Sequence, residues 1–439
     1  MSPAAGIALV LGLLGGLMLA VRAAQRRGAV GAEFARKLVH LGMGTVCLAF
    51  PWIFVSPGPV WILGVLAAGG LLAVRRVPVL RAHLGGVLGG VERASLGEVY
   101  FPFAVALVFA LADGDAAAFC APVAILTFAD AAGALVGQRW GRRRYRAVES
   151  MKSLEGSAAV FGVTCVSVMI ILGALGNSRF VELILTGVIM GAFAALVEAV
   201  SWRGLDNLVV PLVASAQMRI YPRLAWPDLT WRAVVMTALV VFMLNWRSRL
   251  LHFSARLGAA LMMYLFWSLG GWPWLVAPAV LLASYARLMP TVPGGTERYH
   301  LAAVLCIGSA GVIWAGLNAW TPAPVWLWLF TVGFAAQQAI IAAVRFSQGR
   351  PRWSRWQWWL VACVQAVGVQ GIAYVAANGP AAIAARDYAG GATVVAAALA
   401  GFMVWDRELA LPEDLNARWW RQGITAVLAS AAGFALIYL

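Results

Sequence analysis

Apolar residues follow one another in long blocks along the whole of this 439-residue chain, and short polar segments separate the blocks. Most blocks hold about 17 to 25 residues, which as a helix is enough to cross the roughly 30 Å of a membrane's hydrocarbon core. The pattern therefore predicts an all-α, polytopic transmembrane helix bundle of about 15 or 16 spans. We place these spans near residues 4–21, 38–55, 59–74, 99–112, 117–137, 154–175, 180–200, 207–220, 231–246, 256–270, 273–288, 300–319, 325–344, 357–377, 389–405 and 422–439.

The block at 207–220 is the least typical of a span. It is short for a full crossing, and it ends at Gln217, Arg219 and Pro222. A re-entrant or broken helix is therefore an alternative to a crossing helix here. Such a helix is tolerated only where it lines a cavity within the protein.

Composition favours a membrane protein over a soluble one. Hydrophobic residues make up 62% of the chain and charged residues 12%, whereas the apolar share of a soluble domain is nearer half. The net charge of +15 does not indicate a nucleic-acid partner, because the arginines lie in short connectors between apolar blocks. The cysteines lie in apolar blocks with no close pair, so we expect neither a disulfide framework nor a zinc site.

The basic connectors all fall on one side of the membrane when the spans alternate, and we expect that side to be cytoplasmic. Arg22, Arg26 and Arg27 follow the first apolar block, which fits a first span with its N-terminus outside better than a cleaved signal peptide. We therefore expect a multi-pass protein of a bacterial inner (plasma) membrane. The basic connectors are 22–37, 75–93, 139–152, the loop at Arg203, 247–256 and 345–355.

With this topology, the unusual polar residues gather at the cytoplasmic end of the bundle. Any one of them alone is simply explained by a side chain that reaches the membrane interface. Acids reach the interface poorly, however, and Asp130, Glu198 and Asp206 together oppose an arginine cluster, which predicts a functional site. The polar residues at this end are Arg36, Lys37, His40, Glu98, Tyr100, Asp130, Lys152, Glu155, Glu198, Asp206 and Asn207.

Lysine usage is a separate clue to the same site. Of the 33 basic residues, only Lys37 and Lys152 are lysine. A compact ammonium on a flexible stem binds phosphate as a point charge in geometries that a planar guanidinium cannot match. The two lysines therefore predict contacts in which geometry matters as well as charge.

These residue types suit the transfer of a group from a nucleotide polyphosphate. Asp130, with Asp206 or Glu198, is predicted to coordinate Mg²⁺, which prefers one or two carboxylates together with phosphate oxygens. Gly133, Gly137 and Gly141 would let phosphates approach the backbone at a helix end, although small residues also serve helix packing in membranes. Lys152 with the arginines at 139 and 142–144 would neutralise the developing charge. No Walker motif or kinase HRD or DFG signature is present.

Three segments resemble the membrane-embedded, CTP-dependent lipid-alcohol kinases, the phytol kinase and dolichol (polyprenol) kinase group, which is related to the phosphatidate cytidylyltransferases. The first is ARKLVHLGMG (35–44), the second is ADAAGALVGQRWGRR (129–143) with MKSLEGS (151–157), and the third is VEAVSWRGLDNLVVPLV (197–213). A weaker fourth match is GEVYFPFA (97–104). The resemblance covers about residues 30 to 245, and the long arginine-rich connector before Lys152 departs from the family pattern.

The resemblance implies an integral membrane kinase that transfers the γ-phosphate of CTP to the hydroxyl of an isoprenoid or other lipid alcohol at the cytoplasmic face, with Mg²⁺ as cofactor. His40 fits a packing or interface role at least as well as a catalytic one. Carried onto this chain, the implied catalytic residues are Asp130, Lys152, Asp206 and Glu198, and the implied metal ligands are Asp130 and Asp206. The implied nucleotide-binding residues are Gly137, Arg139, Gly141, Lys152, Ser153, Glu155, Gly156, Asn207 and Lys37.

Two other readings stay open. A cytidylyltransferase would attack CTP at its α-phosphorus, although the GLDN-type third segment favours a kinase. A lipid transporter or flippase should show repeated halves with paired broken helices near the midplane, and no internal repeat is evident. We divide the chain into a phytol/dolichol kinase-like transmembrane catalytic module over 1–250 and a transmembrane module of unknown role over 251–439. The identity of the lipid alcohol and the oligomeric state do not follow from the sequence.

Overall fold

The structure is a computed structural model that describes residues 2–77, 97–146, 151–176, 179–200, 204, 206–245, 251–290, 299–350, 352–379, 385–405 and 415–438. The chain forms two compact units, Met1–Met236 and Thr237–Leu439. The division falls inside one helix, α12 (Trp226–Asn245). This structural division is not a test of the two predicted modules. The assignment of catalysis to residues 1–250 and of another role to residues 251–439 stays a prediction.

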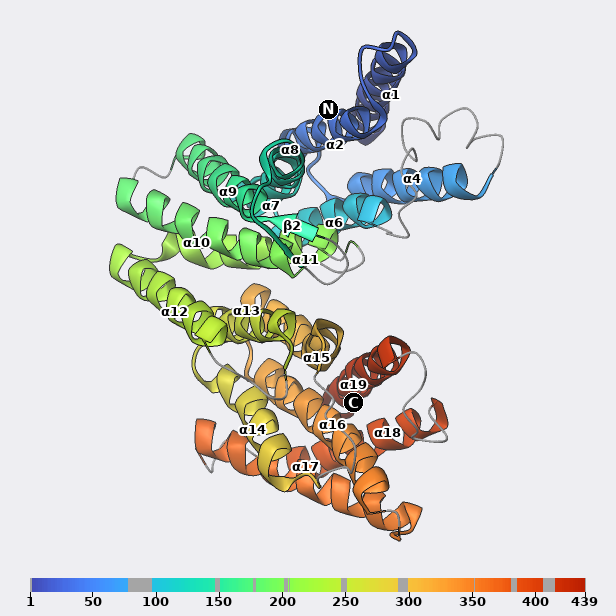
Figure 1. The fold of residues 1–439 in the computed structure, drawn as a ribbon, viewed down its shortest axis with the longest axis vertical. Coiled ribbons are helices and arrows are strands. Elements are labelled where there is room, and N and C mark those ends of the chain that lie inside the picture. The colour runs from blue at the N-terminus through green and yellow to red at the C-terminus, as the bar shows by residue number, and fades with distance from the viewer. Residues whose placement is uncertain are drawn as a thin grey trace. The chain divides into compact units, whose positions relative to one another are not determined.

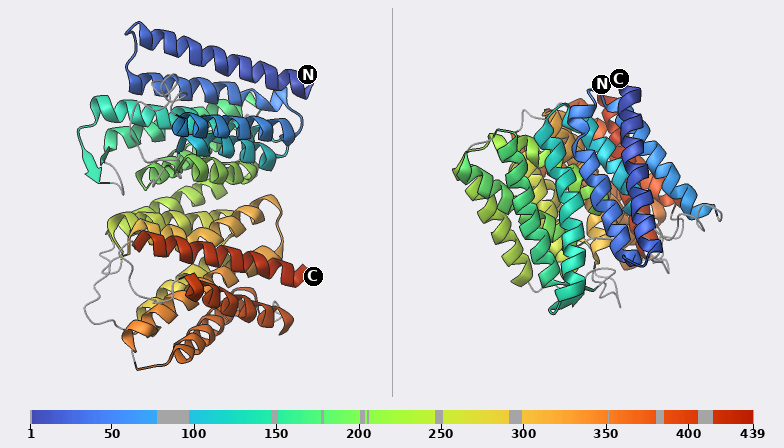
Figure 2. Two further views of the ribbon diagram at one scale, coloured as in Figure 1. Left: turned by 90° about the vertical axis from the view of Figure 1, so that its right-hand side faces the viewer. Right: turned by 90° about the horizontal axis from the view of Figure 1, so that it is seen from above.

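The first unit is a bundle of helices, drawn from blue to green in Figure 1. Neighbouring helices along the chain pack side by side, as α1 and α2 do in Figure 2. Its elements are α1 (Pro3–Arg26), α2 (Ala32–Leu48), α3 (Phe50–Ile53), α4 (Pro57–Arg76), α6 (Gly97–Ala112), α7 (Ala116–Ala124), η1 (Ile125–Ala129), α8 (Asp130–Trp140), β1 (Arg144–Arg146), β2 (Met151–Ser153), α9 (Leu154–Ala174), α10 (Phe180–Ala199), α11 (Asp206–Ile220) and η2 (Tyr221–Arg223).

Helix α7 lies at the centre of this unit, packed by α2, α6, α9 and α11. Asp115 caps its start by accepting hydrogen bonds from the backbone N–H groups of Ala117 and Ala118 at 2.9 and 3.0 Å. Phe119 is buried and packs against Phe109 with ring centroids 5.2 Å apart. This buried helix leads directly to Asp130, so the core of the unit fixes the position of the predicted site.

The helix through the fifth predicted span is not regular. A π-helical turn, η1, interrupts it at residues 125–129, immediately before α8 begins at Asp130. The predicted span at 38–55 is also divided, because α2 ends at Leu48 and the short helix α3 follows. The sequence pattern predicts a helix in both places, but it does not predict the interruption in either one.

The arginine-rich connector before Lys152 contains a small antiparallel hairpin. Strands β1 and β2 pair Arg144 with Ser153 and Tyr145 with Lys152. The hairpin leads straight into α9, and the Leu154 backbone N–H donates to the Arg143 carbonyl at 2.9 Å. The predicted all-α class is confirmed, with this hairpin as an unexpected addition between two helices.

Helix α11, the least typical predicted span, crosses the unit from one end to the other. It begins at Asp206 and ends beside the start of α10, where the Arg179 guanidinium donates to the carbonyls of Pro222 and of Leu224. Arg219 near the same end donates to the carbonyl of Leu111, the penultimate residue of α6, at 3.0 Å. The helix therefore reaches the same end of the unit as the start of α10 and the end of α6. Whether residues 207–220 cross the membrane stays a prediction.

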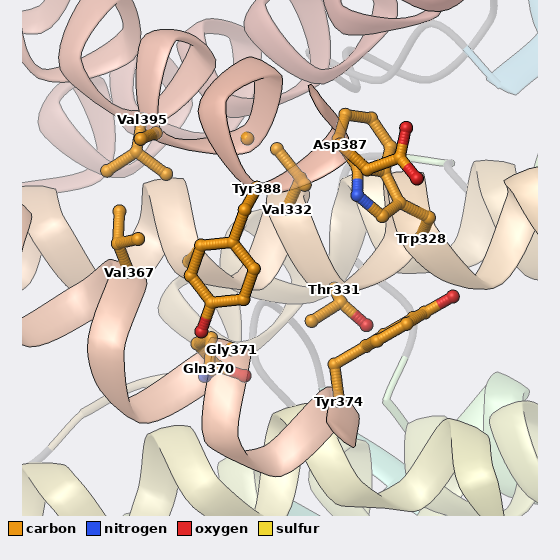
Figure 3. A pocket seen from close by; sticks show the side chains of 13 residues that line it. Trp328, Thr331, Val332, Val367, Gln370, Gly371, Tyr374, Asp387, Tyr388 and Val395 are labelled. Carbon is orange, nitrogen blue, oxygen red and sulfur yellow. The ribbon is translucent and has the colours of Figure 1, made fainter. Parts of the chain in front are cut away.

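The second unit is built around α16, which packs against α14, α15, α17, α18 and α19. Buried glutamines join its helices, since Gln422 donates to Gln337 at 2.7 Å and Gln370 donates to Gln338 at 2.9 Å. Helices α16, α17 and α18 line a cavity (Figure 3). The elements of this unit are α13 (Phe253–Gly270), α14 (Pro273–Leu288), α15 (Leu301–Trp320), α16 (Pro324–Gly349), α17 (Arg355–Asn378), α18 (Ala385–Trp405) and α19 (Leu415–Tyr438).

Helices occupy every predicted span, and the chain is a multi-pass membrane protein. Among the described residues, 8 helices are long and apolar enough to cross a membrane, and three shorter apolar helices accompany them. Helix α16 is the most enclosed of the long ones, with 94% of its most apolar stretch buried. Beyond these 8 helices, the predicted 15 or 16 crossings stay a prediction.

Candidate nucleotide site

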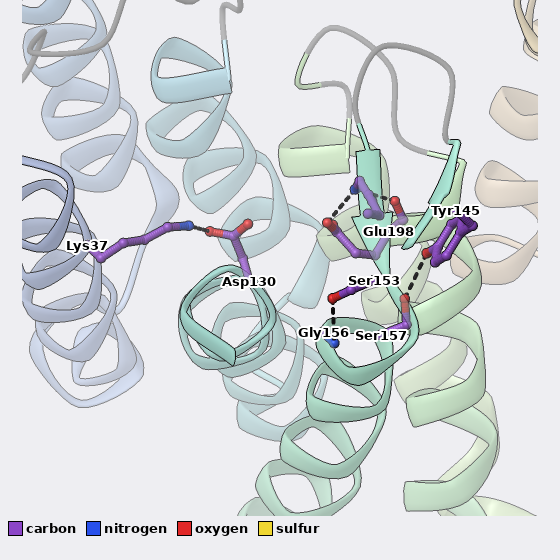
Figure 4. A network of polar contacts seen from close by, with 8 residues as sticks. Lys37, Asp130, Tyr145, Ser153, Gly156, Ser157 and Glu198 are labelled. Atoms are coloured by element: carbon purple, nitrogen blue, oxygen red, sulfur yellow. Dashed lines mark hydrogen bonds and ion pairs between the residues drawn. The ribbon is translucent and has the colours of Figure 1, made fainter. Parts of the chain in front are cut away.

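The first cluster at the predicted site is an ion pair between Lys37 and Asp130 (Figure 4). The Lys37 ammonium lies 2.6 Å from Asp130 Oδ2, and it joins α2 to the first residue of α8. The Lys37 side chain is only 5% exposed, whereas Asp130 keeps 31% of its side-chain surface exposed. The carboxylate is thus held in place by a buried cation while part of its surface stays accessible.

The second cluster joins Lys152, on strand β2, to Glu198, near the end of α10. The Lys152 ammonium forms an ion pair with Glu198 Oε1 and also donates to the Glu198 backbone carbonyl at 2.5 Å. Each of the two lysines therefore pairs with one of the predicted catalytic carboxylates. Sequence reasoning placed the lysines and the acids at one end of the bundle, but it did not predict which lysine pairs with which acid.

Asp206, the first residue of α11, lies within electrostatic range of both clusters. The charges of Glu198, Asp130 and Lys152 all act on its carboxylate. Among the described residues, its Oδ1 atom is buried and has no hydrogen-bond partner. The structure thus brings three predicted carboxylates into one electrostatic environment, and one of them has an oxygen available to a further partner.

His40, one turn after Lys37 on α2, contacts the π-helical turn. Its Nε2 atom lies 3.0 Å from the carbonyl oxygen of Leu126 and 3.7 Å from Asp130 Oδ2, and its ring packs edge-on against Phe101. A π turn shifts the backbone hydrogen-bond pattern of a helix and often occurs at functional sites. His40 therefore holds the turn that sets the position of Asp130, in agreement with a packing role.

Ser153 and Glu155 organise the entry into α9. The Ser153 hydroxyl accepts a hydrogen bond from the Gly156 backbone N–H at 3.1 Å and caps the helix. The Glu155 carboxylate accepts from the Arg143 backbone N–H at 3.2 and 3.3 Å. Tyr145 and Ser157 share a hydrogen bond of 2.8 Å across the same turn. In this structure the KSLEGS segment thus ties the hairpin to the helix, and its predicted contacts with a nucleotide stay a prediction.

The glycines of the second motif lie where α8 and α9 approach each other most closely. A Cβ atom on Gly156 would come within 2.9 Å of the Gly133 carbonyl oxygen, and one on Gly141 within 2.7 Å of the Ser153 hydroxyl. A Cβ on Gly137 would also meet that hydroxyl, at 3.1 Å. Close helix packing, one of the two roles expected for these glycines, is therefore present, and their contact with a nucleotide stays a prediction.

The remaining predicted residues are less constrained. Arg139 is exposed, and its guanidinium lies over the Trp140 ring at 5.5 Å. Asn207 follows Asp206 on α11, and its backbone N–H donates to the Gly204 carbonyl at 3.1 Å. The Glu98 side chain and most of the 75–93 connector lie outside the described residues.

The residues present fit a magnesium ion only together with a phosphate. The described part of the chain contains no group of three or more His, Cys, Asp and Glu side chains that would hold a metal by themselves. Mg²⁺ is commonly held by one or two carboxylates with substrate phosphates and water completing its coordination. The unpartnered Asp206 oxygen and the partly exposed Asp130 carboxylate are compatible with such a shared site.

Comparison with known proteins places the chain in a family. The chain is 32% identical over 201 residues to a phytol kinase from Synechocystis sp., and the alignment covers 45% of this chain and 84% of the relative. No family model matches the chain, and no solved structure matches it. Fold and similarity together define a multi-pass membrane protein related to a lipid-alcohol kinase. The chain belongs to the phytol kinase family.

Proposed function

We propose that this protein is an integral membrane kinase that transfers the γ-phosphate of CTP to the hydroxyl of an isoprenoid or other lipid alcohol, such as phytol or a polyprenol. The observation that carries the proposal is the similarity to a phytol kinase over 84% of that relative's length. The pairing of both lysines of the chain with Asp130 and Glu198 supports it, because phosphoryl transfer needs cations that can move onto phosphate oxygens.

In this proposal the ion pairs are the resting arrangement of the site. Lys37 and Lys152 neutralise carboxylates that would otherwise repel a polyphosphate. When the nucleotide is present, the ammonium groups turn toward its phosphates, and Asp130 and Asp206 would hold Mg²⁺ against the same phosphates. A bound Mg²⁺ would supply electrostatic stabilisation of the charge on the transferring group. The alcohol oxygen then forms a bond to the γ-phosphorus as the bond to CDP breaks, and the hydroxyl proton passes to a carboxylate of the site.

The arginines at 139 and 142–144 and the KSLEGS segment would surround the nucleotide at the membrane surface. We propose that this surface is cytoplasmic, because the basic connectors lie on that side, and that the membrane is a bacterial inner membrane. The chemistry is assigned to residues 1–250, and residues 251–439 would serve another role.

The reaction type is tested with purified protein, CTP labelled at either the γ- or the α-phosphate, and a panel of phytol, polyprenols and diacylglycerol. A kinase transfers label from γ-labelled CTP to an alcohol and none from α-labelled CTP. Transfer of α-label to a lipid phosphate would replace the proposal by cytidylyl transfer. Movement of lipid between leaflets with no labelled product would replace it by a transporter.

A further inference from the structure

The second unit contains a cavity that the candidate nucleotide site does not use. It has a volume of about 50 Å³ and lies between α16, α17 and α18 (Figure 3). A cavity that admits roughly four water-sized probes has room for the head of a small amphipathic molecule rather than for a whole long-chain lipid. Its walls combine valine and alanine side chains with Trp328, Tyr374 and Tyr388.

Several polar groups at this cavity have no partner within the described part of the chain. The Trp328 indole N–H and the hydroxyls of Tyr374 and Tyr388 make no hydrogen bond there. Trp328 and Tyr374 are each 8% exposed, and Tyr388 is 37% exposed. All three groups can donate a hydrogen bond, and the two tyrosine hydroxyls can also accept one. A ligand hydroxyl can therefore act as donor or as acceptor at this cavity.

Gln370 adds a fourth group, and its orientation is fixed. Its amide nitrogen donates to the Ala277 carbonyl at 3.2 Å and to Gln338 Oε1 at 2.9 Å. Reversal of the amide would place its oxygen against the Ala277 carbonyl oxygen, which can only accept. Gln370 Oε1 therefore stays the acceptor, and it is buried with no hydrogen-bond partner at the wall of the cavity.

The charges around the cavity select against a phosphate. Among the described residues that line it there is no lysine, arginine or histidine, and the one acid, Asp387, takes part in a further interaction of its own. An anionic head would find no cation among the described lining residues and would be buried without a counter-charge. An uncharged head that donates a hydrogen bond fits the unpartnered acceptors without the cost of burying an ion.

We propose that the cavity between α16, α17 and α18 binds the hydroxyl head of an uncharged lipid alcohol, with Tyr388 and Tyr374 as its hydrogen-bonding partners. This proposal rests on the proposed function for the identity of the alcohol as the kinase acceptor. It gives the second unit a role in holding the unphosphorylated lipid, since the described lining residues include no basic side chain to pair with the phosphate of the product.

Binding can be measured without catalysis. The full-length protein in nanodiscs of synthetic phospholipid is irradiated with a diazirine-bearing prenyl alcohol in the absence of CTP, and the labelled peptides are mapped. We expect label on residues 324–349, 355–378 and 385–405. Excess phytol should remove it, whereas phytyl phosphate and phytylamine should not. Competition by the amine alone would overturn the proposal, because it would assign the cavity to an ammonium head.

Two variants test the cavity itself. Tyr388→Phe keeps the ring and removes one hydroxyl, so labelling should weaken by about three- to tenfold, the loss expected for one hydrogen bond. Gly391→Ala adds a methyl that would lie 3.4 Å from Val332 Cγ2, an ordinary contact that takes space from the cavity, and labelling should again fall. Gly401→Ala, on the same helix but outside the cavity with its nearest neighbour at 3.9 Å, is the matched control.

The outcomes separate this proposal from the proposed function. Labelled cavity residues in a protein that transfers no phosphate would contradict the kinase function and leave the alcohol site standing. An active kinase whose label maps elsewhere, or whose labelling is equal in Gly391→Ala and Gly401→Ala, would contradict the alcohol site alone.

Discussion

Lys152 holds two oxygens of a single residue, the side-chain Oε1 and the backbone carbonyl of Glu198. A compact ammonium can lie between the side-chain oxygen and the backbone oxygen of one residue. A planar guanidinium presents its donors in a fixed fork and needs more room. The geometry therefore gives a physical reason for a lysine in a chain that otherwise uses arginine almost throughout.

Lys152→Arg should lower CTP-dependent turnover by at least about tenfold although the charge is kept, because the guanidinium cannot reproduce both contacts. The measurement is kcat and KM for CTP with purified protein. Arg26→Lys, at the end of α1, is the control and should stay within about twofold of the parent. Full activity of Lys152→Arg would reduce this lysine to a generic positive charge.

The sequence predicts that the residues of the site lie at one end of the bundle, but it does not predict which side chains form ion pairs with one another. Lys37 and Asp130 are far apart in the chain, and their pairing depends on how α2 packs beside the π turn. The amino-acid composition does not predict a π-helical turn. Pro122 lies three residues before this turn and lacks a backbone N–H donor, which is a local reason for the irregular helix. The role of His40 at the Leu126 carbonyl follows from that turn and was equally inaccessible.

At the scale of helices and strands, each long apolar block forms a helix, because a block in a membrane must satisfy its backbone hydrogen bonds within itself. The hairpin of β1 and β2 was missed because each strand has 3 residues, too few for a period-two pattern to stand out. For the glycines, the sequence left both phosphate contact and helix packing open, and their contact with a nucleotide stays a prediction. Their positions show a close approach of α8 and α9, which depends on the tertiary structure.

Gly156→Ala should destabilise the junction of α8 and α9, because the new methyl would lie 2.9 Å from the Gly133 carbonyl oxygen and 3.3 Å from Gly137 Cα. We expect a clear fall in the thermal unfolding midpoint in detergent, with a cost of about 1 to 3 kcal/mol from overpacking. Gly162→Ala, on the same helix with nothing within 4 Å, should leave the midpoint unchanged or raise it slightly. Equal midpoints for the two variants would contradict this packing.

At the scale of the whole molecule, every residue of the candidate nucleotide site lies in the unit Met1–Met236. The alignment with the phytol kinase covers 45% of the chain, and the second unit has its own core around α16. Two units with separate cores are consistent with separate tasks, chemistry in the first and lipid binding or assembly in the second.

A truncation within residues 247–256 that inserts stably should therefore keep CTP-dependent phosphoryl transfer to a soluble short-chain alcohol analogue. The shortened protein must first elute as a monodisperse species, because exposed helix surfaces promote aggregation. Rates are compared with those of the full chain at saturating acceptor. A folded truncate that binds CTP but transfers no phosphate would place acceptor residues essential to the chemistry in the second unit.

The central claim, that Asp130 and its neighbours form the phosphoryl-transfer site of a lipid-alcohol kinase, is tested most directly by Asp130→Asn. The measurement is transfer of label from γ-labelled CTP to a lipid alcohol by purified protein, beside Glu182→Gln, which removes an acid paired with Arg179 at the other end of α10. We predict a loss of at least about 100-fold for Asp130→Asn, because a neutral amide is a poor Mg²⁺ ligand, and near-parental activity for Glu182→Gln. Activity of a folded Asp130→Asn protein within a few-fold of the parent would contradict the account.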